Sequence, residues 1–196
     1  MSAFEEVSAR NAKWIGEKLA GDPDYFTKLA SGQSPDFFII ACSDSRVSLL
    51  KHAGLDLGEE FSTRNIANLA TPDDTSFMAS LRYAVEHLKV KHVVVCGHSS
   101  CGGLTAALKG VAHDEIADWL KPVDKLIERK QDELSKHADG AERVNCLAHL
   151  NVEEQVQNIY NSPVLEAARA RGQEVKVHGW YLDLSTGRVT DTGVSA

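Results

Sequence analysis

Two continuous apolar runs stand out in the first half of the chain, "DFFIIAC" at residues 36–42 and "KHVVVCGH" at residues 91–98. Each run ends in polar residues, a pattern that is typical of strands covered on both faces in a parallel sheet. Between them, residues 76–88 place apolar side chains at helical spacing (Phe77, Leu81, Ala84, Val85 and Leu88). The order strand, helix, strand predicts a βαβ unit.

The flanking segments predict further helices and two closing strands. A helix over the first 20 residues is followed by a short one with Asp22 as N-cap, Pro23 at its first position and Gly32 as its stop. The other expected helices lie at residues 102–109, at 114–137 with a break at Pro122, at 141–160 and just before Gly172. Residues 174–183 and 187–192 are typical of strands around a turn at Gly187.

These elements predict one α/β domain over residues 1–196, with a mostly parallel β-sheet flanked by helices. A helical arm at residues 1–34 precedes an α/β core with C-terminal strands at residues 35–196. Because the core is complete without the arm, the arm's apolar side chains are expected to pack on a partner subunit (Trp14, Ile15, Leu19, Tyr25 and Phe26). The sequence therefore predicts a homodimer or a multiple of dimers.

Charge and composition narrow the class of protein. The chain has 28 acidic and 21 basic residues, and no run of Lys or Arg that would bind a phosphate backbone, so nucleic acid is not an expected partner. The apolar runs are far shorter than the roughly 20 residues that span a bilayer, so no membrane partner is expected. Glu5, Glu6 and Glu17 argue against a targeting peptide and predict a cytoplasmic protein, with an organellar mature form left open. Four cysteines in such a chain indicate thiols or metal ligands rather than disulfides.

Potential metal ligands follow both apolar runs. Cys42 ends the first, and "GHSSCGG" places His98 and Cys101 at the end of the second. Because the carboxyl ends of parallel strands meet at one edge of a sheet, these three side chains can converge there. Cys, His and Cys is a zinc set, and three protein ligands leave a fourth position for water or substrate, as in catalytic sites. Taken singly, Cys42 or Cys101 would more often be a core residue, and only their combination with His98 favours ligands; for Cys96 and Cys146 we favour packing.

Asp44 and Arg46 lie two residues apart, directly after the first ligand, so their side chains can point the same way. Arginine can hold a carboxylate with two hydrogen bonds, and Asp44 can reach either Arg46 or the metal. Two rival readings remain open: a cysteine-dependent hydrolase or redox enzyme that uses a thiol with His98, and a binding module with structural zinc. The chain has no G-x-S-x-G, G-x-G-x-x-G or Walker A motif, so neither a hydrolase elbow nor a nucleotide cofactor is supported.

The motifs "ACSDSR", "RNIANL" and "GHSSCGG" resemble the signatures of β-class carbonic anhydrases, and "NVEEQV", "SPVLEAARARG" and "HGWYLDLSTG" extend the similarity nearly to the C-terminus. The resemblance implies reversible hydration of carbon dioxide to bicarbonate and a proton through a zinc-bound hydroxide, with one zinc ion per subunit. It implies that Cys42, His98 and Cys101 bind the zinc and that Asp44, held by Arg46, orients the hydroxide. Hydrolysis of an analogue such as carbon disulfide on the same fold stays open.

The resemblance also divides the family into branches. Gln33 matches a plant-type glutamine that binds substrate oxygen, and further substrate-binding positions are implied, some of them supplied by the second subunit of a dimer (Phe61, Ile66, Tyr83 and Gly102). The other branch has a tryptophan three residues before the first cysteine, which builds a non-catalytic bicarbonate site with an arginine and a tyrosine. Here that position is Ile39, although Arg64 and Tyr181 are present. We therefore expect Asp44 to stay paired with Arg46.

Overall fold

The computed structural model describes residues 1–196 as two compact units, Met1–Gln33 and Ser34–Ala196. The first unit contains α1 (Ala3–Gly21) and α2 (Tyr25–Ala30). A capping box opens α1, in which the Ser2 hydroxyl accepts from the Glu5 N–H and the Glu5 carboxylate accepts from the Ser2 N–H. No residue of either helix is buried, and an edge-on cluster of three aromatic rings joins them (Trp14, Tyr25 and Phe26).

The start of α2 differs from the expectation that Asp22 caps a helix beginning at Pro23. The helix begins at Tyr25 instead. The Asp22 carboxylate accepts from the Asp24 N–H at 3.0 Å, and the Asp22 carbonyl accepts from the Tyr25 N–H at 3.1 Å. Asp22 and Pro23 therefore form a turn ahead of the helix, a local structure that competes with an N-cap for the same side chain.

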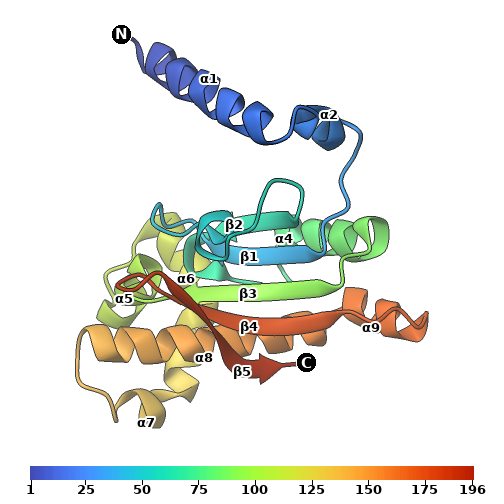
Figure 1. Cartoon of the computed structure of the whole chain (residues 1–196). Helices are drawn as coiled ribbons and strands as arrows, with labels where there is room; N and C mark the ends of the chain where they lie inside the picture. Colours follow the sequence, from blue (N-terminus) through green and yellow to red (C-terminus); the bar gives the residue numbers. More distant parts are fainter. The chain divides into compact units, whose positions relative to one another are not determined.

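The second unit is built on a five-stranded sheet in the order β2-β1-β3-β4-β5 (Figure 1). The strands are β1 (Phe37–Cys42), β2 (Glu60–Asn65), β3 (His92–His98), β4 (Lys176–Asp183) and β5 (Arg188–Ser195). All neighbours are parallel except β4 and β5, which form a hairpin. The mostly parallel sheet is confirmed. The edge strand β2 was missed because its partly exposed, polar positions lack a continuous apolar run.

Most helices of this unit pack on one face of the sheet, and the buried cluster on the other face takes only Leu49 from a helix. The helices are α3 (Leu49–His52), α4 (Thr75–Arg82), α5 (Gly102–Lys109), α6 (Asp114–Arg129), α7 (Gln131–Leu134), α8 (Ala141–Tyr160) and α9 (Pro163–Ala170), with a 3-10 turn η1 (Ile66–Asn68) and a π-helical turn η2 (Tyr83–Leu88). No helix combines the length and apolar character needed to cross a bilayer.

The predicted break at Pro122 is wrong, because α6 runs through it and ends at Arg129. Proline cannot donate to the carbonyl four residues earlier, but that carbonyl belongs to Asp118, an exposed residue whose backbone water can reach. Buried Leu120, Val123 and Leu126 keep the helix on the core across the proline. Packing therefore outweighs the missing hydrogen bond.

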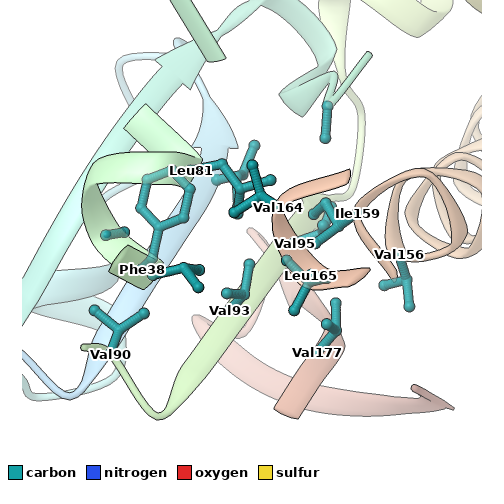
Figure 2. Close-up of a cluster of buried hydrophobic side chains, with 14 of the residues drawn as sticks. Phe38, Leu81, Val90, Val93, Val95, Val156, Ile159, Val164, Leu165 and Val177 are labelled. Atoms are coloured by element: carbon teal, nitrogen blue, oxygen red, sulfur yellow. The ribbon is translucent and has the colours of Figure 1, made fainter. Parts of the chain in front are cut away.

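Alternate residues of the central strands feed two sides of the sheet. Phe38 and Ile40 of β1 belong to the large apolar cluster in Figure 2, together with side chains from β3, α8 and α9 (Val93, Val95, Val156, Ile159, Val164 and Leu165). Ile39 and Ala41 face the opposite side, where they meet Val94, Cys96 and Leu182. Both faces are buried, so the apolar runs are continuous and polar residues follow only where the strands end.

Candidate metal centre

The carboxyl ends of β1 and β3 bring Cys42, His98 and Cys101 together. Their ligand atoms all lie within 4.8 Å of one another, and all three side chains are buried. Cys42 is the last residue of β1, His98 is the last of β3, and Cys101 immediately precedes α5. The sheet thus produces the convergence that was expected from strand ends alone.

The donor set fits a tetrahedral zinc ion. Zn–S bonds of about 2.3 Å at a tetrahedral angle place two sulfur atoms about 3.8 Å apart, and the Cys42 and Cys101 sulfurs lie 4.0 Å apart. His98 Nδ1 is 2.9 Å from the Ser99 carbonyl, so Nδ1 carries the proton and Nε2 is left with its lone pair. That Nε2 is buried and has no hydrogen-bond partner in the protein. A buried lone pair beside two thiols is explained by a metal ion.

The two thiols differ in acidity. A hydrogen bond from Cys101 is the main cause that lowers the pKa of Cys42 to about 4, and the neighbouring His98 side chain and the Asp44 and Ala67 backbone N–H groups add to it. The same hydrogen bond and burial raise the pKa of Cys101. The two sulfurs thus share one hydrogen bond, in which either can be the donor. By contrast, burial alone raises the pKa of Cys96 to about 12, as expected for a packing residue.

Asp44 is bound to Arg46 beside the cluster. The Asp44 carboxylate accepts from Arg46 Nε at 2.9 Å, from Nη2 at 2.7 Å and from the Arg46 backbone N–H at 2.9 Å. These bonds hold the pKa of Asp44 well below its usual 3.8. Arg64 holds the same loop from the neighbouring strand, donating to the carbonyls of Cys42 and Asp44. The carboxylate is therefore ionised and fixed in orientation.

The expected substrate positions do not all gather in this protomer. Ile66 lies close to Gly103, where an added Cβ would be 2.6 Å from the Ile66 Cγ2, so it stands near Gly102 and the ligands. Phe61 and Tyr83 contact each other with ring centroids 5.7 Å apart. Phe61, however, pairs with Phe38, four strand positions before Cys42, which is about 13 Å along the strand. Gln33 ends the first unit.

Sequence reasoning missed a polar network behind the centre. Asn151 and Gln155 of α8 are buried and reach the segment of residues 65–70, where they bond to Ala67 and Ala70. Their signal was present in "NVEEQV", where two amides four residues apart interrupt the inward apolar face of a helix. The other two cysteines stay outside the cluster: Cys96 is fully buried and Cys146 is half-buried.

Comparisons with known proteins agree with this geometry. A family model described as "Carbonic anhydrase" matches residues 37–189. A carbonic anhydrase of Emericella nidulans is 40% identical over 190 residues, which cover 97% of this chain and 83% of the relative. One of Saccharomyces cerevisiae is 31% identical over 194 residues, which cover 95% and 87%.

Solved structures extend the similarity to the whole fold. A structure from a study of two tetrameric β-carbonic anhydrases of Sordaria macrospora superposes with a TM-score of 0.93 at 39% identity and covers 98% of both chains. A Coccomyxa β-carbonic anhydrase in complex with acetazolamide gives a TM-score of 0.91 at 36% identity, covering 97% of this chain and 86% of the other.

Proposed function

The chain belongs to the β class of the carbonic anhydrase family, and from this premise we propose which of its residues carry the reversible hydration of carbon dioxide to bicarbonate and a proton. The observation that carries the proposal is the buried Cys42, His98 and Cys101 cluster with its unpartnered His98 Nε2. These three side chains would hold one zinc ion per subunit. When bound, zinc supplies Lewis acidity, which makes a water molecule in its open position a nucleophile.

Asp44 would orient that nucleophile. A water molecule beside the cluster can donate a hydrogen bond to the Asp44 carboxylate, which leaves an oxygen lone pair free to attack the carbon. Arg46 and Arg64 keep the carboxylate in place and ionised, so that Asp44 accepts rather than donates. A protonated Asp44 would point a hydrogen at the same oxygen and oppose the attack.

Carbon dioxide is small and apolar, so it needs a dry wall more than it needs hydrogen bonds. Ile66 would supply part of that wall in the same protomer, beside Gly102. Phe61 lies too far along β2 to reach its own cluster, and Tyr83 of η2 packs against it, so both would line the cluster of a second subunit. The Gln33 amide would donate to a product oxygen, as in the plant-type branch to which we assign the chain.

The assembly is an oligomer in our proposal, a homodimer or a multiple of it. The study that describes a Sordaria macrospora structure similar to this one names those enzymes tetrameric. Three side chains of α1 are exposed although apolar (Phe4, Val7 and Leu19), which supports packing of the arm on a partner subunit. A cytoplasmic location stays a prediction from the sequence, and cell fractionation would test it.

A stopped-flow assay of carbon dioxide hydration, with zinc quantified in the same sample, tests the function. We expect hydration activity that scales with bound zinc at one ion per chain. A zinc-free protein with a reactive thiol would favour the cysteine-dependent rival, and zinc without hydration would favour a binding module. Activity on carbon disulfide in place of carbon dioxide would change the substrate but keep the site.

A further inference from the structure

The segment between β2 and α4 has an unusual backbone next to the metal centre. Ala67 and Asn68 both adopt left-handed conformations, with φ of 64° and 48°. Residues other than glycine seldom do so, because the Cβ approaches the following carbonyl oxygen. Both residues are fully buried. Such a conformation persists only where the surroundings impose it, and strained segments of this kind cluster at functional sites.

Side chains from two helices and one strand impose this conformation. The Asn151 side chain donates to the Ala67 carbonyl at 2.9 Å, and the side-chain oxygen of Gln155 accepts from the Ala70 N–H at 2.9 Å. Gln155 also donates to Asn151 at 3.0 Å, so the two amides act as one unit. At the near end of the segment, Trp119 Nε1 of α6 donates to the Ile66 carbonyl at 2.8 Å.

The Asn65 side chain closes the same segment from within. Its amide nitrogen donates to the Leu69 carbonyl at 2.8 Å, and its oxygen accepts from the Leu69 N–H at 2.7 Å. Backbone groups of residues 66, 67, 69 and 70 therefore bond to side chains rather than to a regular helix or strand. The backbone has little freedom to shift unless one of these bonds breaks.

The held segment faces the metal centre on two sides. Ala67 is buried in one cluster with Cys42 and Cys101, and a hydrogen bond from its N–H lowers the pKa of the Cys42 thiol. Next to it, the Ile66 side chain and the Ala67 Cβ pack toward Gly103, two residues after Cys101. A shift of the segment would change both the hydrogen bond to a ligand sulfur and the wall of the substrate pocket.

We propose that Asn151 and Gln155 are positioning residues of the metal centre, which fix the segment of residues 65–70 so that the Ala67 N–H bonds to Cys42 and Ile66 lines the pocket. The inference rests on the proposed function for its effect on hydration. A hydrogen bond from an N–H group withdraws electron density from a thiolate ligand, so loss of this hydrogen bond makes the sulfur a stronger donor to the metal. With cobalt(II) in place of zinc, a stronger thiolate donor moves the sulfur-to-cobalt charge-transfer absorption to longer wavelength.

Gln155→Met tests the proposal, because it keeps the side chain's length and removes its three hydrogen bonds, to Ala70, Asn151 and Asn158. Val156→Ala is the matched control: Val156 is the next residue of α8, is fully buried in the apolar cluster of Figure 2, and its side chain makes no hydrogen bond to the segment. We expect Gln155→Met to lower kcat by about tenfold, the low end of what loss of an outer-shell partner costs, and to move the charge-transfer band to longer wavelength. Val156→Ala should lower the Tm and leave the band and kcat unchanged.

An unchanged band and kcat in Gln155→Met would overturn the proposal, and so would equal changes in Val156→Ala, which would reduce the network to a stabilising role. If Gln155→Met does not fold, Trp119→Phe decides, because it removes only the bond to the Ile66 carbonyl from a side chain that is not fully buried. That variant should lower kcat, and normal kcat with an unmoved band would overturn the proposal. The cobalt band also separates the proposed function from the positioning role of Asn151 and Gln155. If the unsubstituted protein has no hydration activity, the proposed function is wrong, but the band shift between this protein and its variants still tests the positioning role.

Discussion

Replacing Asp44 by asparagine separates its role in the reaction from its role in the fold. Asp44→Asn keeps the shape of the side chain but removes the charge that Arg46 binds through three hydrogen bonds. The Arg46 side chain is 54% exposed, so water can solvate it once the pair is lost. An ion pair this exposed contributes up to about 1 kcal/mol. For a chain of this size that corresponds to a fall in Tm of about 2–4 °C.

The effect on the rate should be far larger. A positioned acid or base contributes about 10²–10⁴-fold, so we expect hydration to fall at least about 100-fold in Asp44→Asn. Zinc should stay bound at one ion per chain, because Asp44 is paired with Arg46 and is not one of the proposed ligands. Stopped-flow hydration, metal analysis and thermal unfolding measure the three quantities on one preparation.

Asp36→Asn is the matched control for this experiment. Asp36 forms an ion pair with Lys91 at 2.8 Å, and the pair lies just before β1 and β3, at the edge of the sheet opposite the metal centre. We expect a small change in Tm and a normal rate. Near-normal turnover of Asp44→Asn would refute the role given to Asp44, and loss of zinc would place its carboxylate among the ligands.

Four further predictions follow from the same site. Cys42→Ser, His98→Ala and Cys101→Ser should each lose metal and turnover, and stoichiometric zinc in any of them would remove that residue from the ligand set. Hydration should rise above neutral pH, because two thiolates leave the site little net charge to acidify water, while Arg46 lowers the pKa of Asp44 so far that its carboxylate stays ionised there; a profile already flat below about pH 6.5, the ordinary histidine value, would contradict this. Light scattering should give a dimer or a multiple of it, and a monomer at micromolar concentration would contradict the shared pocket. Bicarbonate should inhibit hyperbolically as a product, and a sigmoidal inhibition curve would count against Asp44 remaining paired with Arg46.

How far the sequence predicts the fold depends on how local the deciding forces are. Strands β1 and β3 were predictable because both their faces are buried, which leaves a continuous apolar run. Strand β2 was not, because it lies at the edge and mixes half-buried with exposed positions. Pro122 is tolerated because of packing across α6, which a local rule cannot weigh.

The same distinction applies to the site. The ligands were predictable, since strand ends of a parallel sheet meet at one edge whatever the loops do. The amides of Asn151 and Gln155 stand out in "NVEEQV", but their partners were not predictable, because Ala67 and Ala70 lie more than 80 residues away and are bound through their backbone. The two hydrogen bonds between the Asn65 side chain and the Leu69 backbone were equally unpredictable from the sequence. Backbone contacts of this kind leave no pattern in the residue types of the partner.

The structure agrees with the prediction that Asp44 stays paired with Arg46, and it corrects one premise of that prediction. Arg64 and Tyr181 cannot build one bicarbonate site in this protomer, because they face opposite sides of the sheet. Arg64 pairs with Ala41, on the side of Ile39, whereas Tyr181 pairs with Gly97 and stacks on His149 of α8. On β4 the register places His178 level with Ile39, while Trp180 and Leu182 pack against the same cluster as Ile39.

What remains beside Ile39 is a cavity of about 230 Å³, lined among others by Glu60 and Arg64. The guanidinium of Arg64 already donates to two backbone carbonyls, those of Cys42 and Asp44. Glu60 has a buried carboxylate oxygen without a partner, and when this carboxylate is ionised its charge opposes a second anion in the cavity. A ligand shifts a conformational equilibrium only as far as it binds one state better. We therefore expect bicarbonate to find no such site here, and Arg64 to keep the loop, and with it Asp44, on the side of Arg46.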